Sequence, residues 1–350
     1  MTGSIKEKRI KARAYFFGEW MPGLWCPPLT HYTDNGQMDF KRMEMHLLKM
    51  SRRIKAFLVP GSTSDGWELS PEETQKLLEY YLQMSKKLRI YLLIGVLRTN
   101  TTSAYEAIKQ TLAWFRKSTQ QSDIIKIMKE LGVCGFAVCS DKGKDRTQDD
   151  IYEGLKKILQ IGVPTALYQL PQMTKNEMSA ETVRSLAKEF SNFYLFKDSS
   201  GTDKVALSDR DFGDVFLLRG AEGDYWKWQK SNGGPYDGFL LGSANCFAEG
   251  ISSVLELLGK GKIDKAKELS KKVKNVVMNV SEAVKDFPAG NAFTNSSKAI
   301  DHFFAYGEGA INIEPPMLHA GVRLRKEFIE VAGQALRENG LMPSEGYVEK

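Results

Sequence analysis

Residues 164–199 read PTALYQLPQMTKNEMSAETVRSLAKEFSNFYLFKDS, and this stretch sets the expectation for the whole fold. It begins with one apolar run (164–170) and ends with another (193–199), and neither alternates apolar with polar residues. Strands that are buried on both faces of a parallel sheet have this pattern. Between them, 179–190 has helical periodicity, with Ser179 in the capping position. The stretch therefore predicts a strand, a crossover helix and a second, parallel strand.

The same unit recurs along the chain. Similar apolar runs lie at 24–30, 54–62, 89–96, 134–140, 215–220 and 238–243, and helical patterns lie between them at 71–87, 101–117 and 122–131. Eight strand–helix units predict an α/β protein with a (β/α)8 TIM barrel. A doubly wound open sheet is the alternative, but it usually carries a Gly-rich phosphate loop after an early strand, and no GxGxxG or GxxxxGK occurs there.

Three regions are expected. Residues 1–21 form an N-terminal extension, residues 22–258 form the barrel, and residues 259–350 form a helical appendage. Within the appendage, helical patterns lie at 263–285, 291–305 and 317–337.

Composition excludes several classes of function. The net charge of +6 comes from mixed Lys and Glu along predicted helices, so a nucleic-acid partner is not expected. Four cysteines without a CxxC pair and only four histidines give no zinc pattern, and we expect neither a metal nor another cofactor. No apolar run is long enough for a signal peptide or a membrane span, so we expect a cytoplasmic protein that does not bind membranes.

Lys197 ends an apolar strand-like run, and active sites of such barrels lie at the C-terminal ends of the strands. One interpretation is a solvated or ion-paired lysine on a loop. The other is a lysine inside the barrel mouth. There, an amine kept from water is more readily neutral, and a neutral amine attacks a carbonyl to form a Schiff base. The stretch alone leaves both interpretations open.

Four further segments resemble a known family. They are PPLTHYTDNGQMDFKRM (27–43), PGSTSDGWELSPEE (60–73), LYQLPQMT (167–174) and FKDSSG (196–201). They resemble segments of the dihydrodipicolinate synthase / N-acetylneuraminate lyase family, which are pyruvate-dependent class I aldolases on a (β/α)8 barrel. The first resembles the family's first strand and its Asp-Gly turn, and the last three lie in the family's order at predicted strand ends. The resemblance extends from about residue 22 to 325.

The resemblance implies roles for seven residues. Lys197 matches the Schiff-base lysine, and Tyr168 matches the tyrosine that relays protons and contacts the keto acid. The remaining five residues match substrate-binding positions. Ser62 and Thr63 match the pair that binds the pyruvate carboxylate, and Leu240 falls where the family uses a backbone carbonyl near the site. Ser199 and Glu222 match positions that contact the second substrate. Taken singly, Tyr168 could be an interior tyrosine, and Ser62 and Thr63 could be turn residues. Taken together with Lys197, they favour the functional interpretation.

Three departures from the family pattern bear on the substrate. Ser64-Asp65 replaces the family's Gly-Glu. Residues 139–146 (CSDKGKDR) lack the relay tyrosine of the synthase branch, and Met173 stands where a synthase has an arginine that binds aspartate semialdehyde. A thioether cannot bind a carboxylate in that way.

We therefore expect a Schiff-base-forming lyase or aldolase that makes or breaks a carbon–carbon bond in pyruvate or a longer 2-keto acid, with dehydration as another possible reaction. A true dihydrodipicolinate synthase and a non-catalytic keto-acid-binding barrel are the alternatives. The expected partners are a 2-keto acid and an aldehyde, and the expected assembly is a homo-oligomer, a dimer or a tetramer. Four basic residues on loops over the predicted mouth either bind the tail of the substrate or are solvated, namely Arg98, Lys142, Lys144 and Arg146.

Overall fold

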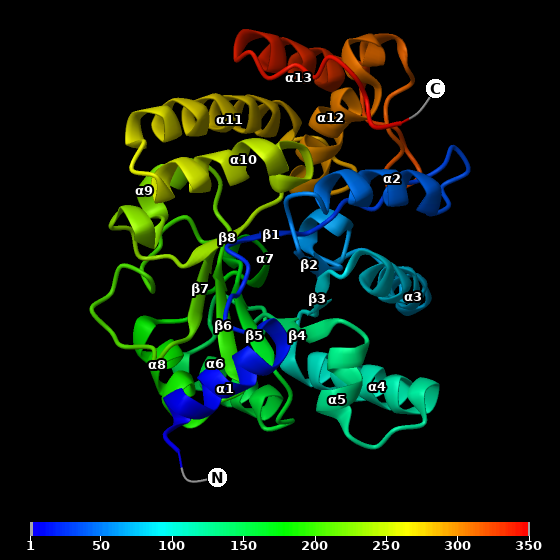
Figure 1. Cartoon of the computed structure of the whole chain (residues 1–350). Coiled ribbons are helices and arrows are strands. Elements are labelled where there is room, and N and C mark those ends of the chain that lie inside the picture. The colour runs from blue at the N-terminus through cyan, green and yellow to red at the C-terminus, as the bar shows by residue number, and fades with distance from the viewer. Residues whose placement is uncertain (1–2, 349–350) are drawn as a thin grey trace. The chain divides into compact units, whose positions relative to one another are not determined.

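The sheet of this protein has eight parallel strands. The structure is a computed structural model that describes residues 3–348. Its strands are hydrogen-bonded in chain order as a closed barrel (Figure 1). They are β1 (Leu24–Cys26), β2 (Ala56–Val59), β3 (Tyr91–Val96), β4 (Val133–Val138), β5 (Thr165–Gln169), β6 (Phe193–Asp198), β7 (Phe216–Arg219) and β8 (Gly238–Leu240). The predicted (β/α)8 barrel is confirmed, although several strands are shorter than their apolar runs.

Helices occupy most of the connections between strands. They are α2 (Phe40–Met50), α3 (Pro71–Leu88), α4 (Thr101–Thr119), α5 (Ile124–Glu130), α6 (Gln148–Leu159), α7 (Pro171–Thr174), α8 (Ala180–Glu189) and α9 (Tyr225–Trp228). The predicted cap of α8 is present, because the Ser179 side chain accepts a hydrogen bond from Thr182 N. Such a bond satisfies one of the unpaired N–H groups at a helix start.

The connection from β6 to β7 differs from the expected strand–helix pattern, because residues 199–215 form turns rather than a helix. Gly201, Asp203, Gly213 and Asp214 all have positive φ angles there. This left-handed backbone interrupts a right-handed helix at both ends of the segment.

Contacts between Cα atoms divide the chain into two compact units. The first comprises the chain up to Gly23 together with Tyr81–Ala221 and Pro235–Leu240. The second comprises Leu24–Tyr80, Glu222–Gly234 and the chain from Leu241 onwards. The boundaries of this division are not those expected from the sequence, and the division into 1–21, 22–258 and 259–350 stays a prediction.

The first unit is anchored by a buried arginine of the N-terminal helix α1 (Ile5–Phe17). The guanidinium of Arg9 donates to the carbonyl oxygen of Phe193 at 2.6 Å and of Phe190 at 2.9 Å, and also to those of Ala187 and Gly213. Burial lowers the pKa of Arg9 to about 10. These acceptors lie at the end of α8, at the start of β6 and before β7, so one side chain ties α1 to three segments.

The second unit carries the C-terminal helices. They are α10 (Ala244–Gly259), α11 (Ile263–Val284), α12 (Ala292–Tyr306) and α13 (Lys326–Glu338). Helix α11 packs against α10, α12 and α13 (Figure 1). Helix α12 also contacts the short 3-10 turn η1 (Ser62–Ser64). The predicted helix over 317–337 begins only at Lys326, because Met317 and Arg323 pair as an isolated antiparallel bridge around a turn at Gly321, whose φ is +74°.

No helix within residues 3–348 is both long and apolar enough to cross a membrane.

Replacing Arg9 with methionine should destabilise the first unit strongly. The change leaves carbonyl oxygens buried without a charged donor, and each hydrogen bond to a charged group contributes about 1.5–3 kcal/mol. We expect a loss of at least about 3 kcal/mol in the free energy of unfolding, measured by urea denaturation. Arg13→Met is the matched control on the same helix, because Arg13 pairs with Asp214 at the surface, where an ion pair contributes below about 1 kcal/mol. Equal losses in both variants would contradict this account.

Candidate functional site

Lys197 and Tyr168 lie side by side in the first unit. Strand β5 pairs with β6 so that Tyr168 is the partner of Lys197, and register partners on parallel strands point to the same side of the sheet. Lys197 is 4% exposed and Tyr168 is 2% exposed. The Lys197 amine (Nζ) lies 3.9 Å from the centroid of the Tyr168 ring. The interpretation of Lys197 as a solvated loop residue is therefore wrong.

Gly220, directly after β7, makes room for the Lys197 side chain. A Cβ atom at Gly220 would lie 2.9 Å from Lys197 Cε and 2.0 Å from Ser199 Oγ, closer than real Cβ contacts. A larger residue would have to displace the lysine. Ser199 is itself held in place, because its N–H donates to Gln169 O at 2.9 Å. The structure thus brings Lys197, Tyr168 and Ser199 together at the C-terminal ends of β5, β6 and β7.

A cysteine that the sequence analysis did not single out as a site residue completes the surroundings of the amine. Cys139 follows β4 and is buried. Burial raises the pKa of its thiol to about 12, and the nearby charge of Lys197 works against this shift. A thiol that stays protonated does not compete with an amine as a nucleophile. The sequence did offer a signal for this residue, because Cys139 lies near the end of the apolar run 134–140, where a strand was expected to end.

A buried polar network holds the turn that follows Lys197. Arg219 donates to both carboxylate oxygens of Asp203 at 2.9 Å, and the Tyr236 hydroxyl donates to Asp203 Oδ1 at 2.6 Å. Asp198 Oδ1 accepts from Ser200 N at 2.9 Å. Burial raises the pKa of Asp198, and the hydrogen bonds from Ser200 oppose the shift. Bidentate arginine–carboxylate pairs are geometrically specific, so this network fixes the path of the chain between β6 and β7.

The loop after β4 is tied to the loop after β5 by one amide side chain. Ser140 Oγ donates to Asn176 Oδ1 at 2.7 Å, and Asn176 Nδ2 donates to the carbonyl oxygens of Asp141 at 2.7 Å and Gly143 at 2.9 Å. This loop holds most of the basic residues that were candidates for a substrate tail. Three of these basic residues are exposed, namely Lys142, Lys144 and Arg146. Arg98 and Met173 are half-buried.

Ser62 and Thr63 lie in the second unit, on the turn η1. Both are buried. Trp67 Nε1 donates to Ser62 Oγ at 2.9 Å, which fixes the serine hydroxyl. A Cβ atom at Gly242, on the loop after β8, would lie 3.0 Å from Thr63 Oγ1. The turn is therefore closely packed by the segment after β8.

Glu222 of the second unit is bound by its own surroundings. Its Oε1 accepts from Ser243 N at 3.0 Å, and its Oε2 accepts from Ser243 Oγ at 2.6 Å and from the Tyr225 hydroxyl at 2.9 Å. Burial and the charge of Glu222 raise the pKa of Tyr225 well above its ordinary value. Leu240, in the first unit, is the last residue of β8 and is buried.

One group in the described residues 3–348 brings three possible metal ligands together, His31, His46 and Asp301. His31 Nε2 and His46 Nδ1 are hydrogen-bonded at 3.0 Å, and His46 Nε2 lies 2.8 Å from Asn245 O. Arg42 already donates to Asp301 Oδ2 at 3.0 Å.

Burial, together with the charge of Arg42, lowers the pKa of His31. The Tyr347 hydroxyl donates to Asp301 Oδ2, the oxygen that also accepts from Arg42, at 2.8 Å. The carboxylate is thus already paired with a cation, and that cation would repel a divalent ion. We interpret this group as a hydrogen-bond network that joins α2 to α12.

Comparisons with known proteins agree with one another. A model of the "Dihydrodipicolinate synthetase family" matches residues 123–289. A 4-hydroxy-tetrahydrodipicolinate synthase from Wolinella succinogenes is 21% identical over 253 residues, which cover 71% of this chain and 78% of that protein. An uncharacterised DapA-like lyase from Pyrococcus horikoshii is 26% identical over 262 residues, 72% of this chain and 82% of that protein.

The fold also matches solved structures. A variant of the 2-keto-3-deoxygluconate aldolase from Sulfolobus solfataricus superposes with a TM-score of 0.68 at 19% identity, covering 91% of this chain and 96% of that chain. At this identity the structural likeness shows the shared barrel fold.

Proposed function

We propose that this chain, which belongs to the dihydrodipicolinate synthetase family, is a Schiff-base-forming lyase or aldolase of that family that acts on pyruvate or a longer 2-keto acid. The observation that carries the proposal is Lys197, a lysine that is only 4% exposed at the end of β6, with its amine 3.9 Å above the Tyr168 ring. A role as the amine that forms the Schiff base explains why a lysine lies buried at this position.

The proposed reaction begins at Lys197 Nζ. The neutral amine attacks the keto carbon, a carbinolamine forms, and loss of water leaves an imine. The protonated imine draws electrons from the adjacent carbon. In the forward direction that carbon loses a proton, becomes an enamine and attacks an aldehyde. In the reverse direction the substrate hydroxyl loses its proton, the carbon–carbon bond breaks, the aldehyde leaves, and the remaining enamine takes up a proton to become an imine. In both directions water hydrolyses the final imine and frees Lys197.

Tyr168 is the proposed proton relay. A phenol both donates and accepts a proton, so it can protonate the departing hydroxyl of the carbinolamine and return the proton later. Its ring packs against the amine of Lys197. The role of the hydroxyl rests on the resemblance of LYQLPQMT to the family segment.

Ser62 and Thr63 are proposed to bind the carboxylate of the keto acid through hydroxyl and backbone N–H groups. The sequence resemblance supports this role, and so does the rigid turn on which they lie. Leu240, Ser199 and Glu222 stay proposed contacts of the substrates. Assembly into a homo-oligomer, a dimer or a tetramer, and location in the cytoplasm are further parts of the proposal, and they rest on the sequence.

The second substrate is proposed to be an aldehyde other than aspartate semialdehyde. Met173 offers no charged donor to a carboxylate, and residues 139–146 have no tyrosine. A true synthase remains the second candidate, because relatives such as the Wolinella succinogenes protein bear that name. The absence of the arginine favours the first candidate.

Lys197→Ala should abolish covalent capture of pyruvate. Incubation with pyruvate and borohydride reduces an imine to a stable secondary amine, which intact-mass measurement detects. We expect the mass adduct in the unmodified protein and in Lys188→Ala, an exposed lysine on α8, and none in Lys197→Ala. Capture that persists in Lys197→Ala would assign the imine to another lysine. If the unmodified protein captured no pyruvate, the alternative of a keto-acid-binding barrel without catalytic turnover would be favoured.

Tyr168→Phe should keep the packing against Lys197 and slow turnover. The ring remains and only the hydroxyl is lost, so kcat should fall by roughly 10²–10⁴, the usual contribution of one acid–base group. Borohydride capture should be slower but still reach completion. A variant with unchanged kcat would place the relay on another residue.

Aspartate semialdehyde should be a poor partner for pyruvate. A hydrogen bond to a charged group contributes about 1.5–3 kcal/mol, so the missing arginine alone predicts a kcat/KM lower by roughly tenfold to a hundredfold. The measurement is kcat/KM for aspartate semialdehyde beside a panel of sugar-derived and aromatic aldehydes. If aspartate semialdehyde gave the highest value of the panel, the synthase candidate would be favoured instead.

A further inference from the structure

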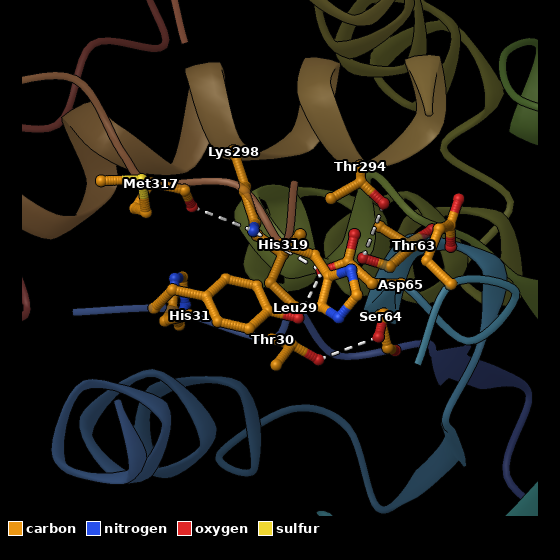
Figure 2. Close-up of polar contacts among 12 residues, drawn as sticks. Leu29, Thr30, His31, Thr63, Ser64, Asp65, Thr294, Lys298, Met317 and His319 are labelled. Carbon is orange, nitrogen blue, oxygen red and sulfur yellow. Dashed lines mark hydrogen bonds and ion pairs between the residues drawn. The ribbon is translucent and has the colours of Figure 1, made fainter. Parts of the chain in front are cut away.

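Helix α12 carries a lysine that the proposed reaction does not use. Lys298 is 1% exposed. Its amine lies 3.6 Å from Asp65 Oδ2 and donates to Met317 O at 3.3 Å (Figure 2). The amine also lies 4.5 Å from the centroid of the Tyr32 ring. Removing an ammonium group from water costs several kcal/mol unless a counter-charge and hydrogen bonds compensate. Asp65 supplies that counter-charge within the same unit.

Asp65 directly follows the turn that carries Ser62 and Thr63. It is 2% exposed, and its φ of +59° places it in the left-handed region, which is unusual for a residue other than glycine. The Tyr32 hydroxyl donates to Asp65 Oδ2 at 3.0 Å. The left-handed backbone is thus combined with a carboxylate whose Oδ2 atom contacts both Tyr32 and Lys298.

The same helix also holds the carbonyl groups of the turn. Thr294 Oγ1 lies 3.2 Å from Thr63 O (Figure 2) and also 3.2 Å from Ser62 O. Asn291 Nδ2, at the cap of α12, donates to Ser62 O at 3.3 Å. In a planar trans peptide the C=O and the following N–H point in opposite directions. Fixing Ser62 O therefore also fixes the direction of the Thr63 N–H.

Burial lowers the pKa of Lys298 below its ordinary value, and the charge of Asp65 opposes this shift. The amine and the carboxylate thus depend on each other, because either charge left alone in this interior would be unfavourable. Removing one partner is expected to shift the other. Because Asp65 is the C-cap residue of η1, a shift of its backbone would be passed on to Ser62 and Thr63.

We propose that Lys298 is a positioning residue that acts through Asp65 to hold the Ser62–Thr63 turn in the conformation that binds the carboxylate of the 2-keto acid. The inference rests on the carboxylate-binding role proposed above for Ser62 and Thr63. If the proposal holds, Lys298 of α12 influences how tightly substrates with a carboxylate bind, and it takes no part in the chemistry at Lys197.

The test uses three variants of the full chain. Lys298→Met removes the charge and keeps an unbranched side chain that is one atom shorter. Asp65→Asn removes the opposite charge with a residue that tolerates a left-handed backbone. The double variant removes both charges, so neither is left unpaired. Lys271→Met, an exposed lysine on α11, is the control.

The readout is the carbonyl concentration that gives half-maximal borohydride capture. It is measured with pyruvate and with acetaldehyde, which has a carbonyl but no carboxylate. Each single variant should raise the half-maximal pyruvate concentration by about tenfold, the scale of one charge-assisted hydrogen bond. The maximal yield and the acetaldehyde value should stay unchanged, as should both values in Lys271→Met. The double variant should lose less than the two single changes multiplied together.

Three results would overturn the inference. One is an unchanged pyruvate value in Lys298→Met. Another is an equal change for pyruvate and acetaldehyde, which would indicate general damage to the fold. The third is multiplicative losses in the double variant, which would show that Lys298 does not act through Asp65. If Lys298→Met does not fold, Asp65→Asn and the double variant still decide the matter, because folded variants with unchanged pyruvate values would contradict the role of the pair. Failure of the proposed function itself looks different, since the unmodified protein would then capture no pyruvate at Lys197.

Discussion

The pairing of β5 with β6 determines which side chains meet at the candidate site. In the observed register Tyr168 lies beside Lys197, while Gln169 lies beside Asp198. Side chains alternate along a strand, so a shift of one residue would turn Lys197 to the other face of the sheet. The bond from Ser199 N to Gln169 O continues this register past the end of β6. Every proposed step at the amine depends on this alignment.

Three of the buried basic side chains in the described chain are accommodated in three ways, and the differences follow from their surroundings. Arg9 donates to backbone carbonyl oxygens, and Lys298 faces the carboxylate of Asp65. Within residues 3–348 no carboxylate forms an ion pair with Lys197, whose amine faces the ring of Tyr168 instead. A carboxylate partner would favour the charged form of an amine, which cannot attack a carbonyl. Among the described residues Lys197 thus has no carboxylate partner of the kind that Lys298 has in Asp65, and this difference supports the role proposed for its amine.

The sequence predicted those features that depend on local pattern. Apolar runs located the strands, and the residue type at each strand end pointed to Lys197 and Tyr168. The turns between β6 and β7 were not predicted, because the left-handed backbone at Asp203 and Asp214 depends on tertiary contacts. The pair of Asp65 and Lys298 was not predicted either, since no periodicity connects residues so far apart along the chain. The resemblance supplied the substrate roles, which local pattern alone left open.

The segments proposed to bind the two substrates are supported differently, and this bears on how each proposed segment tolerates change. The turn of Ser62 and Thr63 is buried and is held by side chains of α12. The loop after β4 is held by the hydrogen bonds of Asn176, and its basic side chains are exposed. Exposed side chains can change without leaving a buried group unpaired, whereas changes around a buried ion pair leave a charge without a partner. The recognition of the carboxylate is therefore expected to tolerate little variation, and the choice of the aldehyde is expected to follow the exposed loop.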